Sequence, residues 1–94
     1  MANKKTITIV KRQGHREPYD ERKIYASVYA ACLVAGDSET SAEKTSSAVA
    51  KKVTKFASEW RVVKSDQIFR QVIVELGKLS PKAVFLYEVH RDLS

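Results

Sequence analysis

Hydrophobic and polar residues alternate near the start of the chain. From Thr6 to Lys11 the sequence TITIVK is β-branched almost throughout and alternates Thr with Ile, which is typical of a half-buried strand. The segment 13–15 (QGH) predicts a turn around Gly14, and residues 16–19 (REPY) predict a short returning strand. Because Pro18 cannot donate a ladder hydrogen bond, we place this second strand at an edge.

Two segments that follow have the three- and four-residue spacing of amphipathic helices. The first helix is predicted to begin after the N-cap Asp20 and to stop at Gly36. Its apolar positions are Ile24, Val28, Ala31, Cys32 and Ala35. The second is predicted to begin with a capping box from Thr40 to Glu43. Its apolar stripe is Ala42, Thr45, Val49, Val53, Phe56 and Trp60, and its other face carries Lys44, Lys51, Lys52 and Lys55.

Two more helices are predicted in the last third of the chain. Ser65 is expected to cap the third helix, with Asp66 in its first turn. The apolar positions of this helix are Ile68, Val72, Ile73, Leu76 and Leu79. The fourth is expected to have Pro81 at its first position and to be largely buried from Ala83 to Val89. The fold class that follows is α+β, a short N-terminal β-hairpin capping a bundle of about four helices.

The composition limits the number of domains, the kinds of partner and the expected location of the protein. With 94 residues, 44% hydrophobic and 30% charged, we expect one domain over residues 1–94, with residues 1–5 flexible. The formal net charge is +6 and the pI about 9.6, so an anionic partner is favoured: nucleic acid, nucleotide, acidic protein or anionic lipid. The single cysteine, Cys32, excludes an internal disulfide, and we read it as a core residue with no metal site nearby. Without a secretory or membrane-spanning pattern, we expect a cytoplasmic location and no membrane partner.

A cluster of cations surrounds Gly14 and supplies the candidate chemistry. Glycine lets the backbone approach a ligand closely, and Lys11 and Arg12 beside it can bond phosphate oxygens. Lys23 falls in the first turn of a helix, where an anion is already favoured. Downstream, Glu17 and Asp20 can accept hydrogen bonds from an adenine amino group or a ribose hydroxyl. The mixed charges favour a compact nucleotide pocket over duplex DNA, although charged residues in such a segment are usually only solvated.

The spacing of this segment resembles the opening motif of the ATP-cone, the nucleotide-binding regulatory domain of many ribonucleotide reductases and of the repressor that controls reductase genes. The matching residues are Val10-Lys11-Arg12-x-Gly14-x-x-Glu17-Pro18-Tyr19-Asp20-x-x-Lys23-Ile24. A looser likeness continues through Ser65-x-x-Ile68 and Tyr87-x-x-His90-Arg91. The sequence departs from the family at Gln13, where Asp or Asn is usual, and at Phe69, where some reductase cones have histidine. Neither a reductase catalytic domain nor a zinc ribbon accompanies the motif.

The resemblance implies a ligand and a set of site residues. ATP or dATP would bind, with or without Mg2+, and the phosphates would contact Lys11, Arg12 and Lys23. Glu17 and Asp20 would lie on the adenine side. The backbone of Ile9 and Val10 would line the slot for the base, and Ser65 would close it. The last helix would contribute a further cation to the site, either His90 or Arg91. The domain, free-standing or excised from a longer protein, would regulate by changing its self-association or its binding to a reductase or regulator partner.

Other readings of the same residues stay open. The lysines of the second helix are either a solvated face or a surface for DNA, so a small basic DNA-binding protein is the alternative function. Trp60 is read as the end of the core stripe, with base stacking as the alternative, and His15 either touches phosphate or is an exposed bystander. We find no catalytic Ser/His/Asp or Cys/His set and no Walker-type loop, so we expect no enzymatic activity.

Overall fold

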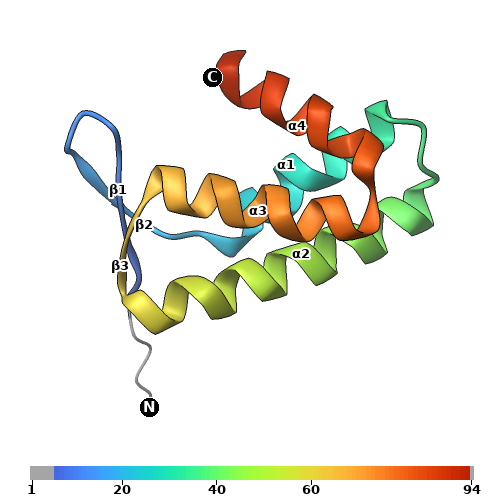
Figure 1. Cartoon of the computed structure of the whole chain (residues 1–94). Helices are drawn as coiled ribbons and strands as arrows, with labels where there is room; N and C mark the ends of the chain where they lie inside the picture. Colours follow the sequence, from blue (N-terminus) through green and yellow to red (C-terminus); the bar gives the residue numbers. More distant parts are fainter. Residues whose placement is uncertain (1–5, 94) are drawn as a thin grey trace.

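Three short strands gather at one end of a helical bundle (Figure 1). The computed structural model describes the backbone of residues 6–93 and the side chains of residues 6–89; the expected flexibility of residues 1–5 lies outside the described residues. The elements are β1 (Thr8–Val10), β2 (Arg16–Pro18), α1 (Glu21–Val34), α2 (Glu39–Trp60), β3 (Val62–Lys64), α3 (Ser65–Leu79) and α4 (Pro81–Leu93). The α+β class, with an N-terminal hairpin and four helices, is confirmed.

The sheet has one strand more than the predicted hairpin. Its order is β2-β1-β3, with β2 at an edge as Pro18 predicted. β1 pairs antiparallel with β2 and parallel with β3, so that Ile9 lies opposite both Glu17 and Val63. The backbone of Arg61, at φ 67°, ends α2 and turns the chain straight into β3, and the Arg61 carbonyl accepts a hydrogen bond of 2.8 Å from the amide of Thr8.

Helix α1 has the boundaries expected from its end signals. The carboxylate of Asp20 accepts a hydrogen bond of 3.0 Å from the Arg22 amide and caps the helix. At the other end Gly36 has φ 102°, a left-handed conformation that suits glycine. Hydrogen bonds from Gly36 N to Leu33 O and from Asp37 N to Cys32 O, each 3.0 Å, form a Schellman motif.

Helix α2 differs from the prediction at both ends. Its N-cap is Ser38, whose Oγ accepts a hydrogen bond of 3.1 Å from the Ser41 amide, so Thr40 lies inside the helix and does not cap it. The prediction that Trp60 ends the core stripe is wrong, because its side chain is 59% exposed. The buried positions are Ala42, Thr45, Ser46, Val49, Ala50, Val53 and Ala57, and the four predicted surface lysines are exposed. A stripe of small residues on this long helix lets the other helices pack closely against it.

Helices α3 and α4 form a hairpin joined at Ser80. The N-cap of α3 is Lys64, the last residue of β3, and not Ser65; the Lys64 amide donates to Gln67 Oε1 at 2.9 Å. Helix α4 begins at Pro81 as predicted. The prediction that it is largely buried is wrong: Ala83 and Tyr87 are buried, whereas Phe85 is 67% exposed.

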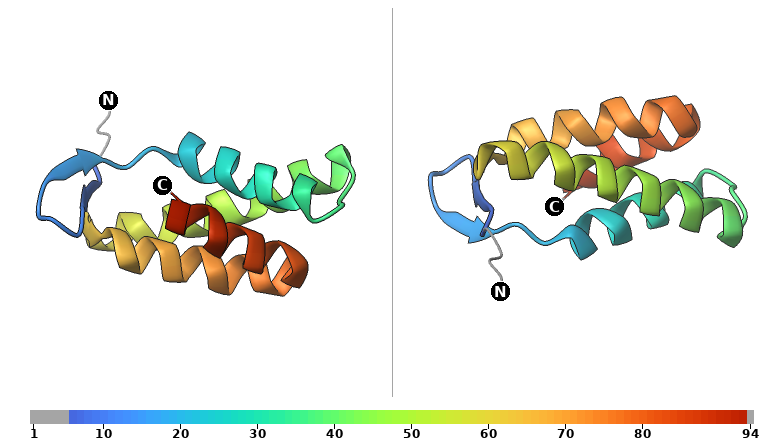
Figure 2. Two further views of the ribbon diagram at one scale, coloured as in Figure 1. Left: turned by 90° about the horizontal axis from the view of Figure 1, so that it is seen from above. Right: turned by 90° about the horizontal axis from the view of Figure 1, so that it is seen from below.

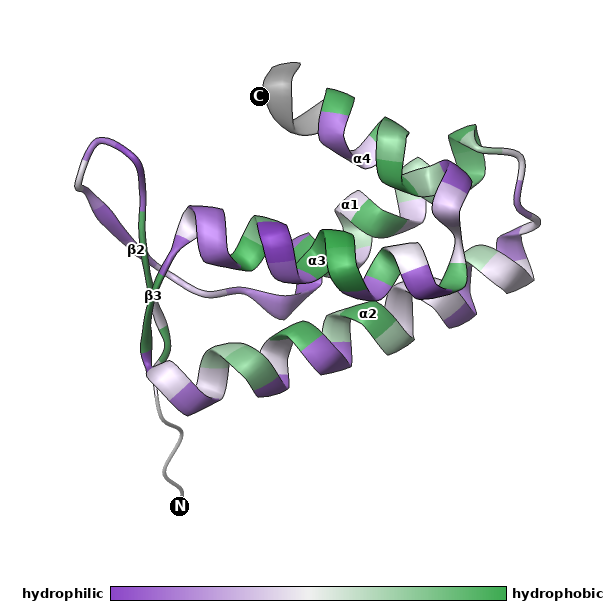
Figure 3. Ribbon diagram, viewed as in Figure 1, coloured by the Kyte–Doolittle hydropathy of each residue, from purple (hydrophilic) through white to green (hydrophobic). Residues whose placement is uncertain are grey.

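The core lies between the four helices and is capped by the inner face of the sheet. Figure 2 shows that the helices extend to the same side of the strands, and Figure 3 shows bands of hydrophobic residues recurring along them. Side chains with almost no exposure include Val28, Val49, Val53, Val63, Val72 and Leu76. Cys32 is a free buried thiol in this core, as predicted, and burial raises its pKa to about 11.

Candidate functional site

A hollow of about 180 Å3 opens where the sheet meets α1, α3 and α4. Its lining combines apolar side chains with two lysines and two carboxylates. The lining residues are Ile9, Lys11, Glu17, Pro18, Tyr19, Asp20, Lys23, Ile24, Ser65, Ile68, Phe69 and Tyr87. Apolar walls with a few convergent polar groups are typical of small-molecule sites.

The register of the strands determines which side chains form one side of this hollow. Ile9 and Glu17 lie opposite each other in β1 and β2, so their side chains share a face of the sheet. Val63, in the same row, is 1% exposed, so this face looks into the molecule. Lys11, two residues beyond Ile9, follows on the same side, and its Nζ lies 3.4 Å from Glu17 Oε2.

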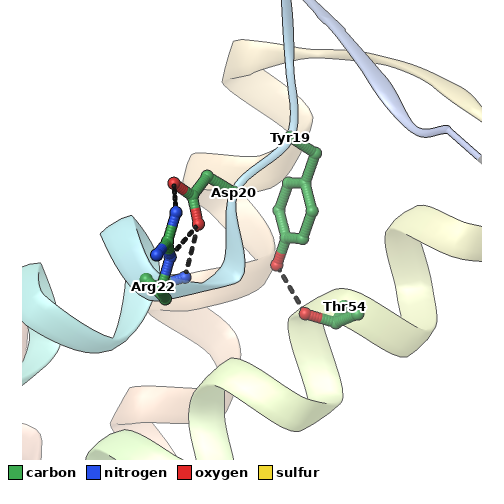
Figure 4. Close-up of polar contacts among 4 residues, drawn as sticks. All are labelled: Tyr19, Asp20, Arg22 and Thr54. Carbon is green, nitrogen blue, oxygen red and sulfur yellow. Dashed lines mark hydrogen bonds and ion pairs between the residues drawn. The ribbon is translucent and has the colours of Figure 1, made fainter.

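The start of α1 supplies the second wall. Besides its capping role, Asp20 accepts hydrogen bonds from the Arg22 side chain, with Nε 3.2 Å from Oδ1 and Nη2 3.3 Å from Oδ2 (Figure 4). These bonds hold the pKa of the Asp20 carboxyl below its usual range and keep it an acceptor. Lys23 follows in the first helical turn, where its ammonium adds to the positive end of the helix.

Tyr19 fixes this wall to the rest of the protein. Its hydroxyl and the Oγ1 of Thr54, in the middle of α2, share a hydrogen bond of 2.8 Å (Figure 4). Burial is the main reason that the pKa of Tyr19 is raised. The bond therefore ties the junction between β2 and α1 to the longest helix of the bundle.

An aromatic pair forms the apolar part of the hollow. Phe69 of α3 and Tyr87 of α4 stack with ring centroids 5.7 Å apart and planes inclined by 18°. In the sequence, Phe69 stands out only as a replacement for histidine and Tyr87 only as part of a closing motif. Phe69 lies one helical turn after Ser65, and this i,i+4 spacing, which ordinary core residues share, is the signal that could have placed it at the site.

A second hollow, of about 330 Å3, adjoins the first at the tip of the hairpin. It shares Lys11 and Ser65 with the first, which makes the two parts of one cleft. Its lining residues are Val10, Lys11, Arg12, Gly14, Lys64, Ser65 and Asp66. Here Arg12 Nε lies 3.4 Å from Asp66 Oδ1, an ion pair that joins the hairpin to the start of α3.

The structure thus brings most of the predicted residues to one cleft, in two groups. The first hollow contains Ile9, Lys11, Glu17, Asp20, Lys23 and Ser65, and the second contains Val10 and Arg12 with Lys11 and Ser65 again. The side chains of His90 and Arg91 lie outside the described residues. His15 is exposed at the turn, which is closed by a hydrogen bond of 2.9 Å from the amide of Lys11 to the carbonyl of His15.

The chemistry of this cleft suits a ligand with an anionic end and a planar end. Cations concentrate near the turn, where Gly14 at φ 95° leaves room for close approach, and aromatic rings lie at the far side. Among the described residues, no three His, Cys, Asp or Glu side chains are grouped to hold a metal ion. Within the same residues, no helix is long and apolar enough to span a membrane.

The family model described as ATP cone domain matches residues 7–91. The match includes both strands of the hairpin, all the lining residues of the two hollows, and helices α1 to α3. No curated protein sequence matches the chain.

Proposed function

Because the chain belongs to the ATP-cone family, whose members are nucleotide-binding allosteric regulatory domains, we propose that it binds ATP or dATP in the two-part cleft described above. The observation that carries this proposal is the convergence of Lys11, Glu17 and Lys23 on one hollow with an aromatic wall. Catalysis is not part of the proposal, and the bound nucleotide acts as an effector.

The cations define where the phosphates would bind. Lys11 is shared by both hollows, Lys23 lies in the first hollow and Arg12 in the second, so a triphosphate between the hollows would meet all three. Charge-assisted hydrogen bonds from these groups are about twice as strong as neutral ones. The amide groups at the start of α3, beside Ser65, add a further favourable environment for an anion. Mg2+, where present, would be held by the phosphates, as is usual for nucleotide sites.

The opposite end of the first hollow would take the adenine. Phe69 and Tyr87 provide an aromatic wall and Ile68 an apolar surface for the ring. Glu17 and Asp20 can accept hydrogen bonds from the adenine amino group or from ribose hydroxyls. A guanine ring, with a carbonyl in place of that amino group, would present an acceptor to a carboxylate and bind less well.

The proposed output is a change in association. Binding of ATP or dATP would alter how the chain associates with itself or with a partner connected to ribonucleotide reductase activity or its transcriptional control. Several large apolar side chains are exposed and available for such contacts. They are Leu33, Val34, Val74, Leu79, Phe85 and Val89.

Titration calorimetry with ATP, dATP and GTP at fixed Mg2+ tests the proposal, with light scattering recorded on each sample. We expect saturable binding of both adenine nucleotides, weaker binding of GTP, and a mass that differs between the ATP and dATP samples. At about 100 times its dissociation constant a nucleotide should add ~2.7 kcal/mol to stability and raise the Tm by roughly 10 °C or more. Equal binding of GTP and ATP would contradict the adenine site, and one constant mass would contradict a nucleotide-dependent change in self-association.

A further inference from the structure

A groove between α2 and α3 lies apart from the nucleotide cleft. It has a volume of about 410 Å3 and shares no lining residue with either hollow of the cleft. Lys51, Lys52, Lys55, Phe56, Glu59 and Glu75 line it. Hydrophilic bands recur along α2 in Figure 3, and the exposed lysines contribute to them.

The groove carries an excess of positive charge. Lys51, Lys52 and Lys55 are exposed, and none of them forms an ion pair with another described residue. Of the two acids, Glu75 accepts a hydrogen bond of 3.1 Å from Gln71, and Lys78 Nζ lies 3.5 Å from its Oε1. Glu75 is therefore already neutralised by α3 itself, and Glu59 alone opposes the three lysines.

This arrangement costs helix stability unless an anion is bound. Lys51 and Lys55 are one turn apart on the same face of α2, where like charges repel. A polyanion that lies along the helix would relieve this repulsion and release its own counterions. The net charge of +6 adds a long-range attraction for such a partner.

Aromatic side chains continue the groove toward the end of α2. Phe56 lines it, and Trp60 follows one turn later with ring centroids 6.4 Å apart and planes inclined by 53°. Trp60 is 59% exposed, so much of its ring faces solvent. An exposed indole beside a lysine row offers a stacking surface for a planar group.

We propose that this groove binds single-stranded nucleic acid, with the three lysines contacting consecutive phosphates and Trp60 stacking on an unpaired base. Positive grooves with aromatic platforms bind single strands with little dependence on sequence. Duplex DNA keeps its bases stacked inside and offers none of them to Trp60, and a run of Asp and Glu contains no ring that could stack on it. This inference does not depend on the nucleotide cleft.

The test uses a fluorescently labelled oligothymidine of about 16 nucleotides, a length within the site sizes of single-strand binders. Anisotropy gives its dissociation constant at several salt concentrations. We expect Lys51→Ala with Lys55→Ala to weaken binding by about 10-fold or more and to lower the salt slope by about 1.4, since each phosphate contact on a single strand contributes ~0.7. Lys44→Ala with Lys82→Ala removes two exposed lysines outside the groove, so it is the matched control and should change binding less than about twofold.

The stacking contact has its own readout. Trp60 is the only tryptophan of the chain, so its fluorescence should be quenched as the oligonucleotide binds, and Trp60→Ala should weaken binding by about fivefold or more. Binding that is abolished by Lys11→Ala but not by the α2 changes would place the strand in the nucleotide cleft and overturn the inference. Equal affinity for a duplex of the same length, or for polyglutamate, with unchanged Trp60 fluorescence would overturn it as well.

Discussion

Tyr19, at the junction of β2 and α1, and Thr54, in the middle of α2, share a hydrogen bond of 2.8 Å across 35 positions of sequence. Tyr19 also lines the candidate nucleotide hollow, so the same residue belongs to the site and to its support. A neutral, partly buried hydrogen bond of this kind contributes about 0.5–1.5 kcal/mol.

We predict that Tyr19→Phe lowers the free energy of unfolding by about 1 kcal/mol. The ring that lines the hollow remains, so the dissociation constant for ATP should change much less than stability does. Urea unfolding of wild type, Tyr19→Phe, Thr54→Val and the double variant forms a double-mutant cycle. Effects that simply add would show that the two hydroxyls are not coupled.

The two lysines of the first hollow are expected to carry much of the phosphate affinity. Hydrogen bonds to charged groups contribute about 1.5–3 kcal/mol each, so Lys11→Ala with Lys23→Ala should raise the dissociation constant for ATP by about 100-fold or more. Both side chains are at the surface or close to it, so the Tm without ligand should hardly move. Lys44→Ala with Lys82→Ala removes the same charge from exposed positions outside the cleft and is the control. Affinity that is the same in both double variants would contradict the proposed phosphate site.

Asp66 is predicted to restrain nucleotide binding. It pairs with Arg12 at 3.4 Å and lines the second hollow, where its carboxylate would repel a phosphate. Because the Arg12 and Asp66 side chains are 67% and 50% exposed, their pairing contributes at most about 1 kcal/mol. Asp66→Asn should therefore tighten ATP binding by up to about fivefold, whereas Glu43→Gln, at an exposed position on α2, should leave it unchanged. Weaker binding in Asp66→Asn would mean that Asp66 helps to hold the ligand.

Local signals in the sequence predicted most of the elements, for physical reasons that lie within a few residues. Gly14 marks the turn, Asp20 caps α1 and Pro81 begins α4, and each acts on its own neighbours. β3 was not predicted, because a strand of only three residues is too short to show an alternating pattern of polar and apolar residues. It is stabilised by parallel pairing with β1, more than 50 positions away in sequence.

The candidate site likewise has a part that local sequence signals predict and a part that depends on long-range packing. The charged residues of the cleft could be proposed from the sequence because the motif places them within fifteen positions of one another. The aromatic wall was not proposed from the sequence, since Phe69 and Tyr87 have the helical spacing of ordinary core residues. Only the packing of α3 against α4 turns them toward the cleft. Trp60 was misassigned for the same reason: the apolar spacing continues beyond the point where the core ends.

Burial in the core allows a prediction about stability that does not involve any ligand. Leu76 is fully buried in α3, so Leu76→Ala leaves a cavity and should cost about 2–5 kcal/mol. Leu79, three residues later in the same helix, is 54% exposed, and Leu79→Ala should stay within about 0.5 kcal/mol of wild type. Urea unfolding of the two variants measures the difference. Similar losses in both would mean that the last turn of α3 is buried in solution.

The lowered pKa of Asp20 predicts that the stability of the fold depends on pH in the acid range. Its pKa is lowered in the folded protein, first by the hydrogen bonds from the Arg22 side chain and then by the Arg22 amide. A group whose folded pKa lies below its unfolded value of about 3.9 stabilises the fold above that value. This stabilisation is lost as the pH falls through the folded pKa. The Tm of the wild type should therefore drop below about pH 4 partly because of this carboxyl. Asp20→Asn keeps a good N-cap but cannot titrate, so it should show a smaller drop over the same pH range. If the two proteins lost stability in parallel from pH 6 to pH 3, the ionised cap would have no part in acid unfolding.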